Sequence, residues 1–291
     1  MDVMIVTRFA PSPTGYLHLG HALAALVAHD AAQAGGGRFL LRIEDLDVAR
    51  AREEFVRAIE EDLHWLGLAW EQPVMRQSAR SPAYRAALDR LAARELLYPC
   101  FCTRAEIALE IARASEAPHG PDGPLYPGTC RSLNPRERER RMAAGHPYAL
   151  RFDSVAAARL LPELTFCDKG ESGEETRMTR VDPLLFGDAV LARKETPAAY
   201  HLAVVVDDAE QNVTLVTRGQ DLLPATHFQR ILQTLLGLPE PHYAHHHLVT
   251  NAVGVKLSKR DGALSLRALR AGGHSAVEVR DLALQSYSQG L

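Results

Sequence analysis

The sequence lacks several features that would assign it directly to a large class of proteins. Only 4 of its 291 residues are cysteines, too few for a disulfide framework in a chain of this length. No run of about eighteen apolar residues indicates a membrane span, and no charged segment followed by an apolar one indicates a secretory signal. We therefore expect a cytoplasmic protein with no membrane partner.

A strong excess of one charge and the common nucleotide-binding motifs are also missing. The formal net charge is only −3, so any nucleic acid would have to be held by local basic patches. Neither GxGxxG nor GxxxxGK[ST] occurs, which argues against the usual dinucleotide fold and against a P-loop. The 46% of hydrophobic residues nevertheless suffice for one large domain or two smaller ones with a proper core.

What the sequence does contain is an alternation of strand and helix patterns. Apolar residues recur at helical spacing after an extended apolar segment, several times along the chain. This alternation favours an α/β fold, in which helices pack on a parallel sheet. We expect strands at residues 4–10, 37–45, 189–195, 213–219 and 242–247, and helices at 21–34, about 55–66, 81–97, 197–211 and about 222–236.

The alternation is interrupted between Cys100 and Asp188. This stretch holds short helical patterns, the Pro/Gly-rich segment APHGPDGPLYPG and the arginine-rich segment NPRERERRMAAG, for which we predict a helix. It indicates an inserted α/β domain that splits the sheet. The expected organisation is a first half of the core (1–99), the insertion (100–188), the second half of the core (189–250) and a basic loop with a short helical C-terminal segment (251–291).

The segment RFAPSPTGYLHLGHA follows the first expected strand. Two prolines and two glycines make a stiff turn, and His18 and His21 then fall at positions i and i+3, so both rings should lie on one side of the first helical turn. Unpaired N–H groups and the helix dipole make such a turn a site for phosphate. In isolation, the pair is equally compatible with surface histidines at a tight turn.

Two further segments, RIEDLD and VKLSKRDGA, narrow the interpretation. Together with PSPTGYLHLGH, AAYHLAVVVDDA and VTRGQDLLPAT they closely resemble the class I aminoacyl-tRNA synthetases of the glutamyl branch, over nearly the whole chain. The resemblance implies a Rossmann-like parallel sheet and activation of L-glutamate by ATP, with Mg²⁺, as glutamyl-adenylate. The family's HIGH motif appears as His18-Leu19-Gly20-His21, and its KMSKS motif as Lys256-Leu257-Ser258-Lys259-Arg260.

The resemblance also assigns the ATP site. Attack of a carboxylate on the α-phosphate builds charge on the departing pyrophosphate, so the protein must supply positioned positive charge and hydrogen-bond donors. The expected catalytic residues are His18, His21 and Lys259. The expected ATP-binding residues are His18, Gly20, His21, Lys256, Ser258 and Lys259.

A glutamate pocket is implied in the same way. It requires cations for the side-chain carboxylate, for which the planar guanidinium is suited, and an anion for the α-ammonium group. Arg8 and Arg218 are the expected carboxylate partners, and Glu44 is expected to face the ammonium group. The whole expected set is Arg8, Phe9, Ala10, Pro11, Ser12, Glu44, Tyr200 and Arg218.

Three cysteines and a tyrosine in the expected insertion match the zinc site of the family. The resemblance implies structural Zn²⁺ bound by Cys100, Cys102, Tyr126 and Cys130. Without it, buried free thiols would be the better interpretation. The histidines of HYAHHH (His242, His245, His246 and His247) could suggest a second metal, but alternate strand positions face opposite sides, so we favour a structural or solvated role.

The chain departs from the glutamyl-tRNA synthetases after Arg260. Only 31 residues follow it (291 less 260), too few for their helical anticodon-binding domain. This is the pattern of a truncated paralogue that attaches glutamate to queuosine in the anticodon loop of tRNA(Asp), and we expect that activity, in a monomer. Two alternatives are open: a truncated glutamyl-tRNA synthetase that charges a tRNA 3′ end, and a non-catalytic synthetase-like binding protein. The intact HLGH and KLSKR motifs argue against the second alternative.

Overall fold

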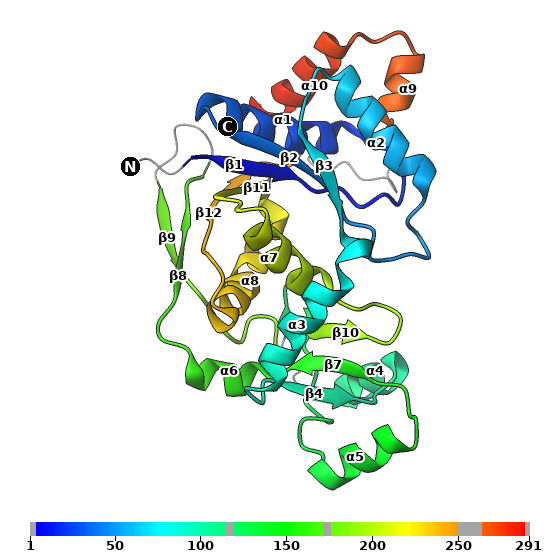
Figure 1. The fold of residues 1–291 in the computed structure, drawn as a ribbon, viewed down its shortest axis with the longest axis vertical. Helices are drawn as coiled ribbons and strands as arrows, with labels where there is room; N and C mark the ends of the chain where they lie inside the picture. The colour runs from blue at the N-terminus through cyan, green and yellow to red at the C-terminus, as the bar shows by residue number, and fades with distance from the viewer. Residues whose placement is uncertain (1–3, 114–118, 171–175, 250–263, 289–291) are drawn as a thin grey trace.

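The computed structural model describes residues 4–113, 119–170, 176–249 and 264–288 (Figure 1). Its first sheet is parallel, with the order β1 (Val6–Phe9), β2 (Arg38–Ile43) and β3 (Glu71–Arg76). Beside β1 lies β11 (Leu215–Gly219), which pairs in parallel with β12 (His242–His246). The Thr214 amide donates to the Val6 carbonyl at 3.0 Å and joins the two sets of strands. The predicted parallel sheet is confirmed.

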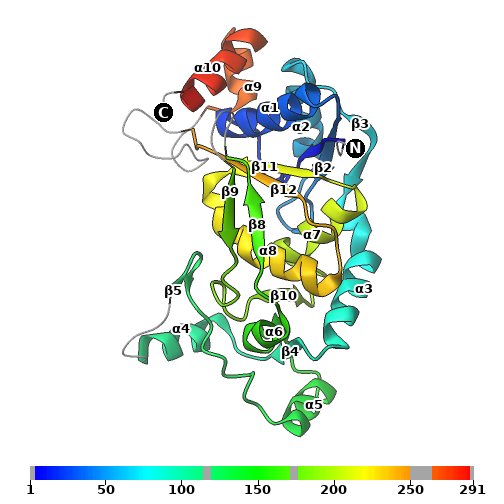
Figure 2. The same ribbon diagram turned by 90° about the vertical axis from the view of Figure 1, so that its left-hand side faces the viewer.

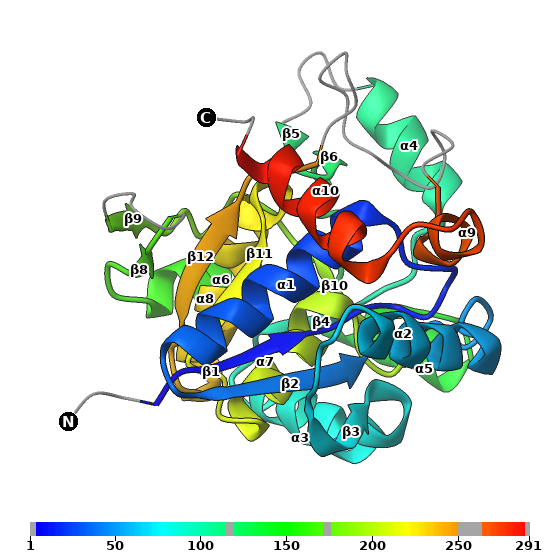
Figure 3. The same cartoon turned by 90° about the horizontal axis from the view of Figure 1, so that it is seen from above.

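Helices cover both faces of these strands (Figures 1 and 3). On one face, α1 (Leu19–Ala34) packs against α10 (Ala276–Ser288), with α2 (Glu53–Trp65) and α9 (Leu266–Ala271) beside them. On the other face lie α7 (Tyr200–Glu210) and α8 (Leu223–Leu236), backed by α3 (Ser81–Ala92). The buried faces of these helices form two apolar clusters, one on each side of the sheet.

A second sheet lies at the opposite end of the molecule from α10 (Figure 2). It is antiparallel, in the order β10 (Val190–Arg193), β7 (Ala149–Phe152) and β4 (Leu97–Cys100). Around it lie the remaining elements of this region: α4 (Arg104–Arg113), β5 (His119–Gly120), β6 (Gly123–Pro124), α5 (Pro135–Ala143) and α6 (Ser154–Leu160). The helix predicted for NPRERERRMAAG is α5.

Two expectations about this region are wrong. The strand expected at 189–195 does form, as β10, but it pairs with β7 and so does not resume the parallel sheet. The helix expected at 81–97 ends early: α3 stops at Ala92, Glu95 takes a positive φ of 58°, and β4 begins at Leu97. An amphipathic pattern continues through such a reversal, because a short buried strand also presents apolar residues.

A hairpin of β8 (Thr165–Asp168) and β9 (Arg177–Arg180) returns from this region to the main sheet. Strand β8 lies parallel to β12, opposite Tyr243, and the Lys169 amide donates to the Tyr243 carbonyl at 2.7 Å. The short 3₁₀ helices Gln77–Arg80 and Gln220–Leu222 precede α3 and α8. Within the described ranges, no helix combines the length and the apolar character needed to cross a membrane.

Candidate active site

The two histidines of HLGH form the amino end of α1. His18 is the N-cap, and its Nδ1 accepts from the Gly20 amide at 3.1 Å, while Nδ1 of His21 accepts from the His18 amide at 3.2 Å. The ring centroids are 3.8 Å apart. The sequence prediction that both rings lie on one side of the first turn is confirmed. Their reciprocal contacts resemble a capping box, in which side chains satisfy the first amides of a helix.

The backbone at Gly20 is in close contact with His18. A Cβ atom added to Gly20 would lie 3.1 Å from Cε1 and 3.2 Å from Nδ1 of the His18 ring. Both distances are shorter than an ordinary van der Waals contact, so only glycine leaves the ring its present position. The residue type at this point of the motif is therefore explained by packing alone.

The chain after residues 250–263 returns to the same turn. The Leu266 amide donates to the Leu17 carbonyl at 2.8 Å, and Ser265 forms a β-bridge with His18. On the other side of that range, Val249 is buried in the same apolar cluster as Leu17. Lys256, Ser258 and Lys259, the expected KMSKS-type residues, lie outside the described residues, and the segment that follows them contacts the amino end of α1 through Ser265 and Leu266.

A buried ionic cluster joins β1, β2 and α7. Asp208 Oδ1 accepts from Arg8 Nε at 3.0 Å and from an Arg42 terminal nitrogen at 2.7 Å, and Asp208 Oδ2 accepts from a second Arg8 nitrogen at 3.4 Å. The Arg42 side chain has no exposed surface. Burial opposes ionisation of both partners, but attraction between them prevails: the pKa of Asp208 is lowered and that of Arg42 raised from their ordinary values.

Glu44 lies at the edge of this cluster. Its carboxylate is 3.4 Å from Arg42, and its backbone amide donates to the Pro11 carbonyl at 3.0 Å, so the RIEDLD and APSPTG segments are held together. Burial raises the pKa of Glu44, and the positive charges of Arg42 and Arg8 oppose that rise only in part. A buried carboxylate in this state gains from a further cation.

Arg218 lies on the same side of the sheet, on β11. Its guanidinium donates to three neutral acceptors: Gln229 Oε1 at 2.8 Å, Thr226 Oγ1 at 2.6 Å and His245 Nε2 at 3.2 Å. His245 is fixed in turn by Asp168, 2.9 Å from its Nδ1. Among the described residues no salt bridge involves Arg218, although the residue is only 5% exposed. Such a buried cation is stabilised by a carboxylate ligand.

The first turn of α7 completes this region. Tyr200 begins the helix, and the His201 ring packs edge-on against Phe186 and Phe228 with centroid separations of 5.2 Å each. Burial, and secondarily the Arg218 charge, lower the pKa of His201 to about 4. Phe228 directly precedes Gln229, the side-chain acceptor of Arg218, so the His201 end of α7 packs on the part of α8 that holds Arg218.

The structure brings most of the expected glutamate-site residues to one region. Arg8, Glu44 and Pro11 are linked by the contacts above. Ala10 is half-buried next to them, whereas Ser12 is exposed. The Phe9 side chain packs into the cluster around α1, on the other face of the sheet, so only its backbone is available here.

Several residues of this region were not singled out from the sequence: Arg42, Asp168, Asp208, Thr226 and Gln229. One signal was available for Asp208, because YHLAVVVDDAE places two aspartates in an otherwise apolar helix, and buried carboxylates require partners. For His245, the structural role expected of the HYAHHH histidines is confirmed by its position between Asp168 and Arg218.

The expected zinc ligands form a compact cluster. The sulfur atoms of Cys100, Cys102 and Cys130 all lie within 4.8 Å of one another, with Cys102 and Cys130 only 3.4 Å apart. The Tyr126 hydroxyl lies 3.4 Å from Cys100 Sγ and 3.5 Å from Cys102 Sγ. Thiolates bound about 2.3 Å from a tetrahedral zinc ion lie roughly 3.8 Å from one another. The four donor atoms therefore fit a tetrahedral cation.

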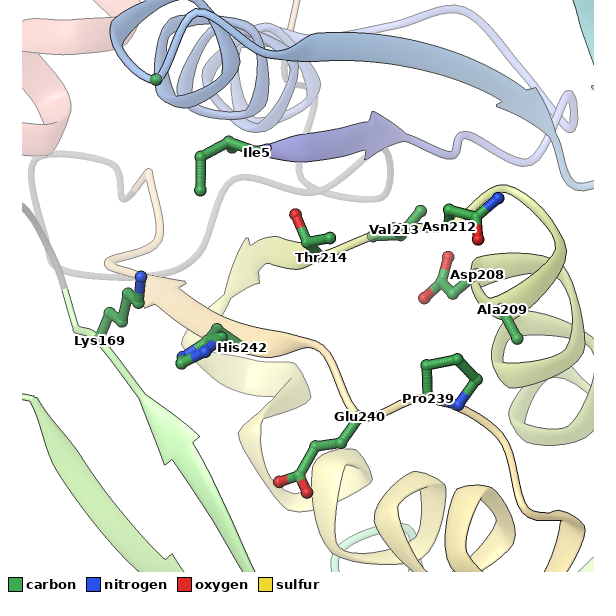
Figure 4. Close-up of a pocket in the computed structure, with 11 residues that line it drawn as sticks. Ile5, Lys169, Asp208, Ala209, Asn212, Val213, Thr214, Pro239, Glu240 and His242 are labelled. Atoms are coloured by element: carbon green, nitrogen blue, oxygen red, sulfur yellow. The ribbon is translucent and has the colours of Figure 1, made fainter. Parts of the chain in front are cut away.

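A cavity of about 750 Å³ opens at the amino ends of β1, β11 and β12. Figure 4 shows Asp208 and Asn212 on one side of it and Lys169 and His242 on the other. Parallel α/β sheets bind their ligands at the carboxyl ends of the strands. This cavity lies at the opposite edge from His18 and His21, so we do not assign it to the candidate active site.

Residues 4–279 match the family described as tRNA synthetases class I (E and Q), catalytic domain. The glutamyl-Q tRNA(Asp) synthetase of Rhodobacter capsulatus is 49% identical over 96% of this chain and 99% of its own length. The enzyme of the same name from Nocardia farcinica is 47% identical over 98% of this chain and 84% of its own.

Among solved structures, the glutamate-tRNA synthetase of Elizabethkingia anophelis superposes with a TM-score of 0.73 at 28% identity. The superposition covers 89% of this chain and 53% of that one, so the chain spans about half the length of this structural relative. The fold and the sequence thus lead to the same group of proteins.

Proposed function

The chain belongs to the class I tRNA synthetases of the glutamate and glutamine type, and from this we propose that it activates L-glutamate with ATP and transfers the glutamyl group to queuosine in the anticodon loop of tRNA(Asp). The observation that carries the proposal is the 49% identity to the Rhodobacter capsulatus glutamyl-Q tRNA(Asp) synthetase over 99% of that enzyme. The arrangement of buried charges and the histidine-capped helix support the chemistry.

In this proposal Arg218 binds the side-chain carboxylate of glutamate. Its hydrogen-bond partners among the described residues are neutral, so a carboxylate of the substrate would supply the negative charge that they lack. Arg8 is a second partner, since Asp208 engages two of its nitrogens, and the acceptor that the described residues offer its third nitrogen is the Thr217 carbonyl, at 3.4 Å. Glu44, whose pKa is raised by burial, receives the α-ammonium group.

ATP binds with its phosphates at the amino end of α1. The helix dipole and the imidazoles of His18 and His21 stabilise charge there. Mg²⁺ would accompany the nucleotide phosphates and neutralise part of their charge. The glutamate α-carboxylate attacks the α-phosphate, pyrophosphate leaves, and Lys259 stabilises the charge that develops.

The activation step is tested by glutamate-dependent ATP–pyrophosphate exchange. Lys259→Ala should lower the exchange rate on the order of 100-fold or more, a typical loss for one preorganised charge-stabilising contact. Lys169→Ala, which removes an exposed lysine at the opposite edge of the sheet, is the matched control and should leave exchange unchanged. Equal exchange by the two variants would remove Lys259 from the mechanism.

The acceptor is tested with labelled glutamate on two forms of tRNA(Asp). We expect label on the form with queuosine and none on the form with guanosine at that position. Label should remain after the 3′ adenosine is trimmed, and it should travel with the anticodon fragment. Label on the terminal adenosine would favour a glutamyl-tRNA synthetase, and absence of exchange in the unmodified chain would favour a non-catalytic binding protein.

We also propose that Cys100, Cys102, Tyr126 and Cys130 hold one structural Zn²⁺ ion. The four donor atoms lie at distances that suit tetrahedral coordination, which leaves no position for a reactive water. The ion would connect β4 to the segment around Cys130. Elemental analysis should find one zinc per chain and a strong loss in a Cys100→Ser, Cys102→Ser double variant. Cys167→Ser is the control, and zinc-free protein prepared without chelator would contradict the proposal.

A further inference from the structure

Arg218 and His245 lie opposite each other on the neighbouring parallel strands β11 and β12. Residues paired in this way leave the same face of a sheet, and His245 Nε2 lies 3.2 Å from Arg218 Nε. Asp168 ends β8, which joins the same sheet beside β12, and its Oδ2 lies 2.9 Å from His245 Nδ1. Three strands therefore place a carboxylate, an imidazole and a guanidinium in a row, and all three residues are buried.

The His245 ring is fixed by contacts on several sides. Asp168 Oδ1 accepts from the His245 backbone amide at 3.3 Å and from the Gly170 amide at 3.2 Å, so the carboxylate itself is held by two backbone groups. The Tyr243 ring lies nearly parallel to the imidazole, at 6° and with a centroid separation of 6.1 Å, and the Arg218 guanidinium lies 5.5 Å from the centroid of that ring. These contacts leave the imidazole little freedom to turn.

The hydrogen bonds of this row determine which His245 nitrogen carries the proton. Arginine has no acceptor atom, so Nε2 must accept from Arg218 Nε, and the ring proton must lie on Nδ1, where Asp168 accepts it. Burial lowers the pKa of His245, although the hydrogen bond to Asp168 opposes this change, so the ring is neutral at pH 7. Asp168 therefore holds one tautomer of a neutral ring.

The neutral ring separates a negative from a positive side chain. A direct ion pair between Asp168 and Arg218 would neutralise the guanidinium, whereas the imidazole orients it without placing a negative charge in contact with it. A guanidinium carries five N–H groups. His245 accepts from the one on Nε, and Gln229 and Thr226 accept from one on each terminal nitrogen, so these contacts leave two N–H groups (five less three). A carboxylate can accept from both in a bidentate pair.

We propose that Asp168 and His245 are positioning residues for the amino-acid substrate: they orient Arg218 so that its terminal nitrogens receive the side-chain carboxylate of glutamate. This inference rests on the proposed function and extends it by two residues that act through Arg218. It also gives the site a basis for rejecting glutamine, whose side-chain amide has one acceptor oxygen and would present N–H groups to the guanidinium. A ring in the other tautomer would deprive Arg218 of the acceptor that sets its direction.

The test uses variants of the full-length protein. Asp168→Asn keeps an oxygen for the backbone amides but turns an N–H group toward His245 Nδ1, so the ring proton should move to Nε2 and meet the N–H group of Arg218. His245→Leu removes the ring, and His245→Gln restores an acceptor near the position of Nε2. His227→Leu is the matched control, because this histidine also accepts a hydrogen bond, from the Asp182 amide at 2.9 Å, and that bond does not involve Arg218.

The kinetic readouts are kcat, the KM for glutamate and the KM for ATP in ATP–pyrophosphate exchange, and the same exchange with glutamine in place of glutamate. Nitrogen-15 NMR of histidine-labelled protein shows which nitrogen of His245 is protonated, and the signals of this residue are those missing from His245→Leu. Thermal unfolding gives the Tm of each variant. A merely structural role would lower Tm without raising the KM for glutamate alone and without depending on the tautomer.

We expect Asp168→Asn and His245→Leu each to raise the KM for glutamate about 10- to 100-fold, as for a misplaced substrate contact, with kcat and the KM for ATP unchanged. Their preference for glutamate over glutamine should fall. His245→Gln should recover most of the loss, and His227→Leu should show none. Asp168→Asn should add no loss to His245→Leu, because it acts through the ring. The ring proton should lie on Nδ1 in the unmodified protein and on Nε2 in Asp168→Asn.

Three results would overturn the positioning role and leave the proposed function intact. They are an unchanged KM for glutamate in both single variants, a further loss in the double variant, and a proton on Nε2 of His245 in the unmodified protein. Absence of glutamate-dependent exchange in the unmodified protein would instead overturn the proposed function, and this inference with it.

Discussion

The buried carboxylate of Asp208 offers the sharpest test of the charge arrangement described above. Its two oxygens accept three hydrogen bonds from two arginines, at 3.0, 2.7 and 3.4 Å. The substitution Asp208→Asn keeps the shape of the side chain, but it removes the negative charge and presents an N–H group to a guanidinium. Arg8 and Arg42 would then be two buried cations without the carboxylate that they share.

The expected loss of unfolding free energy in Asp208→Asn depends on the partners that Arg42 keeps. Removal of one member of a buried ion pair costs about 3–5 kcal/mol, because the other charge stays buried and unpaired. Arg42 keeps Glu44 at 3.4 Å and Gln211 at 3.0 Å, so the loss should fall near the lower end, about 3 kcal/mol. Since about 1 kcal/mol shifts the Tm of a domain of roughly 150–250 residues by 2–4 °C, the Tm should fall by roughly 6–12 °C.

The assay is denaturant unfolding of Asp208→Asn beside Glu163→Gln. Glu163 pairs with Arg180 at 3.1 Å, but both side chains are more than half exposed, so its removal should leave the unfolding free energy unchanged within measurement. In addition, Arg8→Met should lower the free energy of unfolding less in the Asp208→Asn background than in the unmodified protein. The difference between the two losses, the coupling energy, should be about 0.5–3 kcal/mol. A loss below about 1 kcal/mol for Asp208→Asn, or no coupling, would refute the reasoning.

Three further outcomes are expected. In Gly20→Ala the added Cβ atom would lie 3.1 Å from the His18 ring and displace it, so the rate of ATP–pyrophosphate exchange should fall about 10-fold. The Tm should not fall, because alanine favours a helix. An unchanged exchange rate would contradict the packing argument. Asp62→Asn should raise the free energy of unfolding at pH 7 by about 1 kcal/mol. Burial raises the pKa of Asp62 to about 6, the Arg270 charge offsets this rise only in part, and one carboxylate oxygen has no hydrogen-bond partner among the described residues. A lower Tm for Asp62→Asn would contradict this expectation. The pKa of His201 falls from 6.5 to about 4, so the stability from its neutral form is complete above pH 6.5 and is lost as pH falls toward 4, by up to about 3 kcal/mol; unfolding curves of His201→Leu should lack this component.

Much of the fold could be predicted from residue patterns. The apolar stripe of α2 and the face of α8 that carries Phe228, Ile231 and Leu232 recur at helical spacing, and both helices form where expected. The histidine pair at the start of α1 was predictable for a local reason, since its geometry depends on three consecutive peptide units.

The pairing of strands that lie far apart in the sequence was harder to predict. Strand β10 has an apolar pattern that suits a parallel or an antiparallel neighbour equally well, so its sequence could not decide between β7 and the main sheet. Strand β8 contacts β12 at a single register position, opposite Tyr243. Neither partner could be derived from periodicity, because the choice of neighbour depends on how the whole chain is folded.

Only part of the polar network of the site could be predicted from the sequence, and α7 shows why. Asp207 and Asp208 are consecutive, so their side chains leave the helix about 100° apart, and each must find its own partners. Asp207 accepts from Gln77, Arg80 and Tyr84, whereas Asp208 binds Arg8 and Arg42, and these two sets come from different elements. The sequence indicates that two buried carboxylates need cations, but it contains 33 lysines and arginines, and only the fold selects among them. Because Asp207 ties α7 to the 3₁₀ helix Gln77–Arg80 and to α3, and Asp208 ties it to β1 and β2, the two aspartates fix the position of α7 against the main sheet.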